Sequence, residues 1–319
     1  MENLLEIKNL SVNFEMPDRT VMAVRNLSFS LANGEALGLV GESGCGKSVT
    51  AFSISRLLPK QAKIVSGEIL YRGQNILTMQ DADLRKIRGK EIAMIFQEPM
   101  TSLNPVFTIG YQICESLKLH LGMTNKEARE YAADLLDQVG IAMPSKRIDS
   151  YPHEFSGGMR QRAMIAMALS ASPSLLIADE PTTALDVTIQ SQILDLLLKL
   201  QEEKKMSLLL ITHDLGVVSN VVDRVAIMYA GEISEIGTTE QVFNTPMFPY
   251  TVGLFNSIPQ IGKVKDKLST IPGSVPTVTD LPEGCVFYPR CEKRKQECSV
   301  TQINLVEQKK MHLVRCINI

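Results

Sequence analysis

The segment GESGCGKS, from Gly41 to Ser48, has the residue types and spacing of a phosphate-binding loop. It fits the pattern G-x-x-x-x-G-K-[ST], in which glycines let backbone N–H groups face an anion. Lys47 would neutralise phosphate oxygens, and the Ser48 hydroxyl would ligate Mg²⁺. An apolar run typical of a buried strand precedes the loop, and a run typical of a helix follows it. Because a helix N-terminus favours an anion, the segment predicts a nucleotide phosphate site.

Asp179 and Glu180 supply the second half of a site for hydrolysis. They end the run LLIADE, whose apolar residues are typical of a buried strand. Asp179 can hold Mg²⁺ through water, and Glu180 can orient and deprotonate an attacking water. Such a pair alone is more typical of an ordinary strand-to-helix turn. Together with a phosphate-binding loop, it predicts nucleotide hydrolysis.

A third segment, FSGGMRQR from Phe155 to Arg162, predicts a second phosphate-binding helix end. Ser156 is a helix N-cap residue, and two glycines follow it in the first turn. The signal is weak alone. Two phosphate-binding helix ends in one chain need not serve one nucleotide within one molecule, so the pattern favours a dimer.

Four of the six cysteines lie near the end of the chain. Their spacing is C-x5-C-x6-C-x17-C, which lacks the C-x2-C pairs common at structural zinc sites and differs from simple ferredoxin runs. A reducing compartment would make disulfides unfavourable. The spacing leaves zinc, an iron–sulfur cluster and unliganded thiols open. The four residues are Cys285, Cys291, Cys298 and Cys316.

The elements that must position these residues read as an α/β core. The runs 174–180 and 207–212 are short, apolar and end in polar residues, as central parallel strands do. Residues 124–140 have helical periodicity with a capping box from Thr124 to Glu127, and the run from Asp186 forms a second amphipathic helix. After about Gly237 the composition shifts toward proline, which predicts a boundary there.

Length and charge set further limits. The chain has 319 residues with 45% hydrophobic content, enough for about two domains. Its net charge of -2 gives no global reason to expect a nucleic-acid partner. The N-terminal residues lack the features of a signal peptide, and the most apolar stretch, 163–178, is too short to span a membrane. We therefore expect a cytoplasmic protein.

With these motifs in order, the sequence resembles the ATP-binding-cassette family, in particular ATPase subunits of bacterial dipeptide, oligopeptide and nickel importers. GESGCGKS is similar to Walker A, FQEP to the Q-loop, FSGGM to the signature, LLIADE to Walker B, ALD to the D-loop and THD to the switch-histidine motif. Phe155 and Met159 depart from the commonest signature residues, yet both resemble this importer branch.

The resemblance implies a head-to-tail dimer in which each ATP lies between Walker A of one subunit and the signature of the other. Closing with ATP and reopening after hydrolysis would drive transport. It implies catalytic roles for Glu180, His213 and Gln97, and Mg²⁺ binding through Ser48, Gln97 and Asp179. The remaining nucleotide-binding positions are Phe14, Gly41, Ser43, Gly44, Cys45, Gly46, Lys47, Val49, Ser156, Gly157, Gly158 and Asp186. Phe14 fits adenine stacking and a strand core position equally, and Cys45 reads as a filler residue.

The resemblance also implies an architecture. The fold class is an α/β P-loop NTPase core with a mixed, mainly parallel sheet, an N-terminal antiparallel β part, an inserted helical subdomain and a Cys-rich extension. The expected boundaries are 1–97 and 171–236 for the core, 98–170 for the helical subdomain and 237–319 for the extension. The cysteine tail resembles importer ATPases in which four cysteines hold a [4Fe–4S] cluster, with zinc the disfavoured alternative.

Partners and location follow from the same resemblance. We expect two membrane-spanning permease subunits, a second, paralogous ATPase subunit and, indirectly, an extracytoplasmic solute-binding protein, with the chain at the cytoplasmic face of the membrane. Residues 99–110 would contact a permease coupling helix. A cassette ATPase acting on nucleic acid and an electron-transfer module regulated by ATP are the alternatives. The solute, whether a dipeptide, a longer peptide or a nickel complex, and the choice of homodimer or heterodimer stay open.

Overall fold

A computed structural model describes residues 2–98, 102–183, 185–257, 271–274, 276 and 281–319. The chain forms two compact units, each made of several segments. We call them the carboxylate unit (Met1–Leu4, Ala32–Glu35 and Thr78–Ile211) and the phosphate-loop unit (Leu5–Leu31, Ala36–Leu77 and Thr212–Ile319). Each is described by itself.

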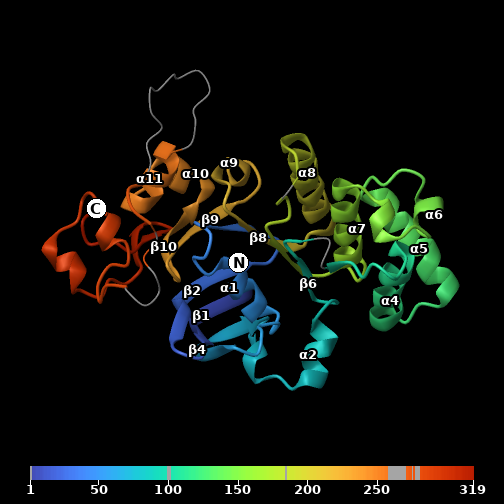
Figure 1. Ribbon diagram of the computed structural model, residues 1–319, viewed down its shortest axis with the longest axis horizontal. Coiled ribbons are helices and arrows are strands. Elements are labelled where there is room, and N and C mark those ends of the chain that lie inside the picture. The colour runs from blue at the N-terminus through green and yellow to red at the C-terminus, as the bar shows by residue number, and fades with distance from the viewer. Residues whose placement is uncertain (1, 99–101, 184, 258–270, 275, 277–280) are drawn as a thin grey trace. The chain divides into compact units, whose positions relative to one another are not determined.

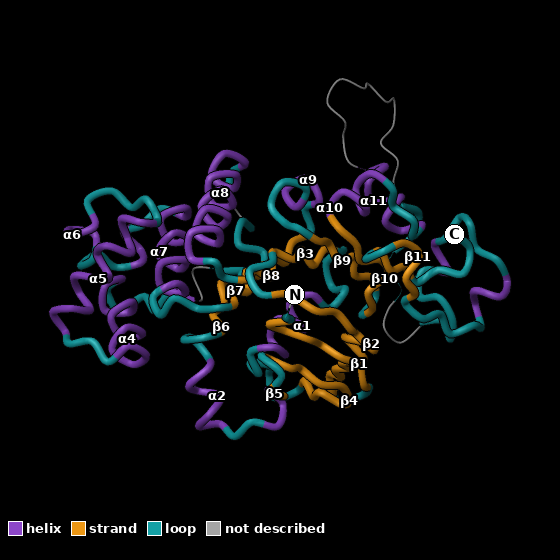
Figure 2. Tube along the Cα trace, turned by 180° about the vertical axis from the view of Figure 1, so that it is seen from behind, coloured by secondary structure: helices purple, strands orange, loops and turns teal. Residues whose placement is uncertain are grey.

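The phosphate-loop unit begins with an antiparallel sheet in the order β2-β1-β4-β5, drawn as orange strands in Figure 2. A register shift between Lys8 and Ser11 interrupts the pairing of β1 with β4. Leu10 and Val12 of β1 are fully buried, which fits the period of two expected for a half-buried strand. The strands are β1 (Asn3–Glu15), β2 (Thr20–Ala32), β4 (Ala62–Tyr71) and β5 (Gln74–Asn75).

A second set of strands in this unit has the order β11-β12-β10-β9-β3. The fully buried β3 runs parallel to β9, and β9, β10, β12 and β11 are joined antiparallel. β3 leads into the phosphate-binding loop and then into α1 (Lys47–Ile54). The strands are β3 (Ala36–Val40), β9 (Arg224–Tyr229), β10 (Glu232–Thr238), β11 (Val306–Lys309) and β12 (His312–Val314), and the further helices are α9 (Leu215–Val218), α10 (Thr239–Asn244), α11 (Pro249–Ser257), η3 (Tyr288–Arg290) and η4 (Gln296–Ser299).

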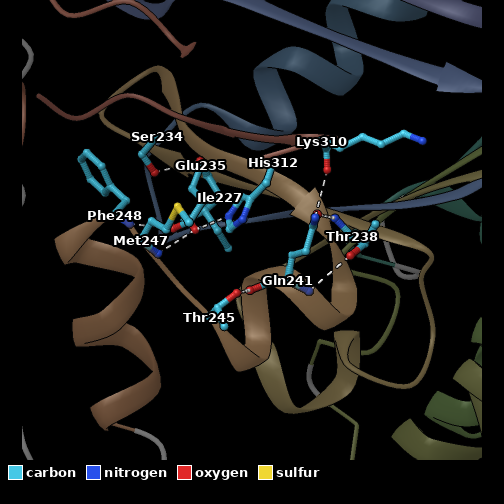
Figure 3. A network of polar contacts seen from close by, with 10 residues as sticks. All are labelled: Ile227, Ser234, Glu235, Thr238, Gln241, Thr245, Met247, Phe248, Lys310 and His312. Carbon is cyan, nitrogen blue, oxygen red and sulfur yellow. Dashed lines mark hydrogen bonds and ion pairs between the residues drawn. The ribbon is translucent and has the colours of Figure 1, made fainter. Parts of the chain in front are cut away.

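A buried polar network fastens the C-terminal hairpin β11-β12 to β10 (Figure 3). The carboxylate of Glu235 accepts hydrogen bonds from the backbone N–H of Met247 at 2.8 Å and of Phe248 at 3.0 Å. It also lies 2.7 Å from Nε2 of His312, and both side chains are fully buried. Gln241 of α10 donates to the carbonyl of Lys310 in the hairpin turn. One carboxylate therefore joins β10, β12 and the start of α11.

The carboxylate unit has a parallel β6, β7 and β8 and a group of helices, of which α4, α5, α6 and α7 lie together in Figure 1. The strands are β6 (Ile92–Ile95), β7 (Leu175–Asp179) and β8 (Ser207–Thr212, whose last residue belongs to the other unit), and the helices are α2 (Asp81–Ile87), α4 (Ile109–Leu121), α5 (Asn125–Gln138), α6 (Pro144–Arg147), α7 (Gly157–Leu169) and α8 (Val187–Lys204). A 3-10 turn, η2 (Pro152–Glu154), precedes α7. Along the chain, one boundary between the two units falls within a second 3-10 turn, η1 (Ile76–Thr78).

Both predicted amphipathic helices are present. The Thr124–Glu127 capping box is formed, and Ala128, Ala132, Leu135 and Leu136 of α5 are buried. The sequence pattern predicts one apolar face of α8 made of Ile189, Ile193, Leu196, Leu197 and Leu200. Of these, Ile193, Leu197 and Leu200 are buried and the other two are half-buried, while Leu194 is also buried. Among the described residues, no helix combines the length and the hydropathy that spanning a bilayer requires. The structure confirms the predicted fold class: parallel strands with helices, plus an antiparallel N-terminal sheet.

Candidate functional site

The phosphate-binding loop has a backbone that requires two of its glycines. A Cβ on Gly41 would collide with the carbonyl oxygen of Met228 and lie 2.8 Å from the Cys45 sulfur. Gly46, the N-cap of α1, has φ of +105°, and its Cβ would lie 2.5 Å from the carbonyl of Ala23. Side chains therefore cannot replace these glycines without moving the backbone. The loop shape depends on its packing against neighbouring strands of the same unit.

Lys47 lies inside this loop and fixes its carbonyl groups. Its side chain is buried, and Nζ donates to the carbonyls of Gly41 at 2.8 Å and Glu42 at 3.1 Å. Ser43 and Gly44 are exposed, and Ser48 and Val49 are half-buried. The loop therefore presents its tip to solvent while the lysine amine is held beneath it, an arrangement suited to phosphate.

Cys45 fills the space under the loop. It is 1% exposed, and burial raises the pKa of its thiol, the largest influence on that group. A protonated, buried thiol is a poor nucleophile. This environment fits the interpretation of Cys45 as a filler residue.

In the carboxylate unit, Asp179 is the last residue of β7 and Glu180 follows it, and Gln97 lies just beyond the end of β6. Ile95 and Ala178 are paired in the parallel register of β6 and β7. Gln97 and Glu180 each lie two residues beyond this pair, at the same end of the two strands. Nε2 of Gln97 donates to Oε2 of Glu180 at 2.9 Å. Asp179 is buried, 1% exposed, whereas Gln97 is exposed. The structure thus brings together Gln97 and Glu180, which the sequence placed 83 residues apart.

Glu180 has a constrained backbone and a fixed side chain. Its φ is +46°, a left-handed value that is uncommon for a residue other than glycine. Its N–H donates to the carbonyl of Ile211 in β8, and Oε2 accepts from the Thr183 hydroxyl at 3.0 Å. Strained backbone of this kind is found preferentially at functional sites. The fold therefore holds this carboxylate at the end of the strand in one orientation.

His213 belongs to the phosphate-loop unit, where it follows Thr212 at the end of β8. The ring is exposed. Asp214 caps the short helix α9 by accepting from the Gly216 N–H at 2.8 Å, and its own N–H donates to the Thr212 hydroxyl. These turn contacts fix the backbone on both sides of His213.

The signature segment opens α7 as predicted. Ser156 is the N-cap and accepts from the Met159 N–H at 3.3 Å, a contact that contributes about 1 kcal/mol to a helix. Ser156 and Gly157 are exposed, and the first turn carries no acidic residue. Phe155, which directly precedes the N-cap, is 2% exposed, so its side chain is packed in the protein interior. The helix end is therefore open to solvent and favourable to an anion.

Two predicted nucleotide contacts have structural roles of their own. Asp186 is the N-cap of α8 and accepts from the Ile189 N–H at 2.9 Å, which sequence reasoning did not anticipate. The first residue of the ALD motif, Ala184, lies outside the described residues. Phe14 is half-buried near the end of β1, opposite Ala62, so both of its interpretations stay open.

The four C-terminal cysteines line one small cavity together with apolar side chains that include Phe248, Phe287 and Ile303. Its volume is about 20 Å³, close to that of one water molecule. Burial raises the pKa of Cys285 to about 11 and also raises the pKa values of Cys291 and Cys316. In the described part of the chain, however, no three His, Cys, Asp or Glu side chains are grouped so as to hold a metal ion. The predicted convergence of the thiols is present, and the predicted [4Fe–4S] cluster is not supported by this geometry.

Within the phosphate-loop unit, sequence reasoning missed a contact between the C-terminal cysteine segment and the phosphate-binding loop. Arg290, between two of the cysteines, forms an ion pair with Glu42 of the phosphate-binding loop at 3.0 Å. The two residues are 248 positions apart, and no sequence motif links them.

Comparison with known proteins finds family matches both for the region of the phosphate-binding loop and for the C-terminal region. A family model described as "ABC transporter" matches residues 24–183, and one described as "Oligopeptide/dipeptide transporter, C-terminal region" matches residues 234–298. The chain is 49% identical to a putative peptide import ATP-binding protein of Brucella melitensis, over 98% of this chain and 96% of the relative. It is also 49% identical to a dipeptide transport ATP-binding protein of Bacillus subtilis, over 99% of this chain and 95% of the relative.

Two solved structures have the same fold. One is a dimeric ATP-binding cassette in a post-hydrolysis state bound to ADP and Pi, with a TM-score of 0.67 and 28% identity, covering 74% of this chain and 98% of that chain. The other is a component of a Clostridium perfringens ABC transporter complex, with a TM-score of 0.65 and 26% identity, covering 80% of this chain and 96% of that chain.

Proposed function

Because this chain belongs to the ABC transporter family and carries the C-terminal region of its oligopeptide and dipeptide transporters, we propose that it is the ATP-hydrolysing subunit of a peptide importer. The observation that carries the proposal is the preformed phosphate-binding loop, in which Nζ of Lys47 donates to the Gly41 carbonyl. Within the carboxylate unit, the Gln97–Glu180 contact holds a carboxylate suited to hydrolysis. Of the two relatives named above, one is described as a putative peptide import ATP-binding protein and the other as a dipeptide transport ATP-binding protein.

Binding of ATP would use the loop from Gly41 to Ser48. Its exposed tip and the buried Lys47 suit the β- and γ-phosphates, and α1 begins at the loop. The hydroxyl of Ser48 and the carboxylate of Asp179 are hard oxygen donors of the kind that Mg²⁺ prefers. We propose that they hold this ion, with Gln97, and that the ion neutralises charge on the phosphates.

Hydrolysis would use Glu180 as the general base that deprotonates the attacking water. Gln97 and Thr183 hold the Glu180 carboxylate in place, so it need not reorganise during the reaction. His213, exposed at the end of β8, would contact the γ-phosphate. Each role is carried over from the family onto the matching residue of this chain.

A second ATPase subunit would complete each site. The open N-terminus of α7, with Ser156 at its cap and no acidic residue in its first turn, suits the phosphate of an ATP held by a partner. The solved cassette with ADP and Pi is dimeric. We propose closure of a head-to-tail dimer on ATP and reopening after hydrolysis, with a paralogous ATPase as the partner.

Permease subunits are the membrane partners that a peptide importer requires. Val106 and Phe107, just before α4, and Tyr111, in its first turn, are large, exposed hydrophobic residues. The Phe107 and Tyr111 rings stack with centroids 4.6 Å apart. Such a patch suits a protein partner. We propose that it receives a coupling helix of one of two permeases at the cytoplasmic face of the membrane. Pro99 to Thr101, also predicted to take part, lie outside the described residues.

The experiment is reconstitution of the complete transporter in liposomes, with the solute-binding protein present. We expect di- or oligopeptides to stimulate ATP hydrolysis and to accumulate inside. Failure of any peptide to do so, with stimulation by a nickel complex, would instead favour the nickel-importer alternative. Salt-sensitive binding to DNA or RNA would favour a cassette acting on nucleic acid, which the importer relatives disfavour.

Phe107→Asp is expected to reduce peptide-stimulated hydrolysis about tenfold or more in these liposomes, since it places a charge in the centre of an apolar contact. Leu119→Asp is the matched control, because Leu119 is a 75% exposed apolar residue at the other end of α4. Equal stimulation in the two variants would contradict the proposed docking surface.

We also propose that the four thiols hold a [4Fe–4S] cluster. Support comes from the family resemblance, since thiolates are the preferred ligands of such clusters. All four cysteines line one apolar cavity, although in the described residues no three of them are grouped so as to hold a metal ion. The side chains would have to move outward, because a cavity of about 20 Å³ is too small for the cluster. When bound, the cluster would cross-link segments of a tail that has little core of its own.

Metal analysis of anaerobically purified protein tests this assignment. We expect roughly four iron and four sulfide per chain, with loss of iron in Cys285→Ser and retention in Cys114→Ser. Cys114 is the matched control, because it is half-buried in α4 and is not among the residues that line the cavity. Stoichiometric zinc without sulfide, or protein free of metal, would contradict it.

A further inference from the structure

Every polar group of Glu42 in the phosphate-binding loop has a partner in the phosphate-loop unit. Its N–H donates to the hydroxyl of Tyr250 at 3.1 Å, and its carbonyl accepts from Nζ of Lys47 at 3.1 Å. Its two carboxylate oxygens lie 3.0 and 3.4 Å from the terminal nitrogens of Arg290. Tyr250 and Arg290 both belong to the C-terminal part of the chain. The second residue of the loop is thus held from outside the loop.

Arg290 is built into a site that holds its guanidinium in one position. Its side chain is 6% exposed. Nε donates to the carbonyl of Pro272 at 3.0 Å, and the terminal nitrogens donate to the carbonyl of Ile271 and the hydroxyl of Tyr229, both at 3.4 Å. Because Arg carries its donors in a rigid fork, this set of acceptors selects a single orientation.

The surrounding aromatic rings tie this guanidinium to the cysteine segment. Arg290 lies over the ring of Tyr229, 5.8 Å from its centroid. Tyr229 packs against Tyr250 with ring centroids 4.7 Å apart and meets Phe287 edge-on at 5.2 Å. Phe287 and Arg290 both belong to the turn between Cys285 and Cys291, which the Tyr288 N–H closes onto the Cys285 carbonyl. The cysteine segment therefore carries the residue that reaches the loop.

The charge of Glu42 gives this contact a function. A carboxylate in a loop that binds a triphosphate opposes the ligand, since like charges repel. A buried, paired guanidinium cancels that charge and keeps the carboxylate directed to the loop's flank. Loss of Arg290 would leave the negative charge beside the phosphate site without its main compensation.

We infer that Arg290 is a positioning residue for ATP binding: it neutralises and holds Glu42, so that the affinity for ATP depends on the folded segment between Cys285 and Cys291. The inference rests on the proposed function, because it assumes that the loop binds ATP.

The test measures ATP affinity in the full chain with four variants. R290M is expected to weaken MgATP binding about tenfold, within the range of coupling between contacting charged residues, with the loss in KM rather than in kcat. E42Q in the R290M background is expected to restore affinity to within about threefold of the wild type, because the uncompensated charge is then gone. R294M is the matched control, since Arg294 lies on the same segment and contacts Pro289 and Tyr288. R290K keeps the positive charge but not the rigid set of guanidinium donors. It is expected to lose less affinity for MgATP than R290M does.

Unchanged affinity in R290M, or a double variant as weak as R290M, would overturn the inference; the second result would mean that Arg290 is only structural. If R290M does not fold, R290K with and without E42Q carries the test, and equal affinity of R290K and the wild type would overturn it. Absence of ATP binding in the wild type itself would instead refute the proposed function.

Discussion

Glu180→Gln is expected to slow ATP hydrolysis by about 10²- to 10⁴-fold, the range contributed by a general base, while ATP still binds. The substituted side chain has the same shape but cannot accept a proton from water. Oε2 of Glu180 accepts hydrogen bonds from Gln97 and Thr183, and an amide oxygen can accept both. The structural cost is therefore small, and the dimer should accumulate in its closed, ATP-bound form.

Phosphate release in a single turnover measures the chemical step, and gel filtration with MgATP measures the closed dimer. Thr183→Val is the control, because it removes one hydrogen bond to the same oxygen and leaves the carboxylate. We expect that variant to lose only severalfold in rate, as a positioning contact would. Turnover at the wild-type rate in Glu180→Gln would refute the assigned role of Glu180.

Glu235→Ala is expected to destabilise the C-terminal hairpin by about 3–5 kcal/mol, because it leaves three buried polar groups without their shared partner, at about 1–3 kcal/mol each. Alanine would leave the N–H groups of Met247 and Phe248 and the ring of His312 without their shared acceptor. The Nδ1 atom of His312 is also buried and makes no hydrogen bond in the described structure, so the ring depends on its contact with Glu235. Figure 3 shows these groups meeting at one carboxylate.

Amide hydrogen exchange in β12 measures this loss locally, and urea unfolding measures it for the whole chain. Gln241→Ala is the matched control, since it removes the hydrogen bond to Lys310 and the cap of α10 from a more exposed position on the same hairpin contact. We expect that substitution to lower the free energy of unfolding by about 1 kcal/mol. Equal exchange rates in the two variants would contradict a central role for Glu235.

The parts of the site that sequence could predict are those in which residue type dictates local backbone. Gly46 and Lys47 define their loop because a left-handed φ and a buried amine leave few substitutes, and Ser156 and the Thr124–Glu127 box mark helix starts through short-range hydrogen bonds. The positions of the buried strands followed from apolar runs, because their burial leaves no polar face.

The unpredicted parts depend on contacts between distant segments. The ion pair between Glu42 and Arg290 depends on the tertiary fold, which brings together residues far apart in the sequence. Asp186 was assigned to nucleotide binding, and its second role as the N-cap of α8 was not predicted. The spacing of the cysteines likewise could not say how large a cavity they would share. The domain boundaries and the individual catalytic roles stay predictions, because they came from family resemblance.

The hairpin β11-β12 also has a consequence for solubility. β10 pairs with β9 on one side and with β12 on the other, and its five central residues are buried. Without the hairpin, this buried strand would expose a row of unpaired backbone groups, a template for intermolecular β-pairing and aggregation. The outer strand β11 is instead short, fully exposed and charged, with Glu307 and Lys309 among its four residues. The C-terminal region thereby ends the sheet with an edge that resists further pairing.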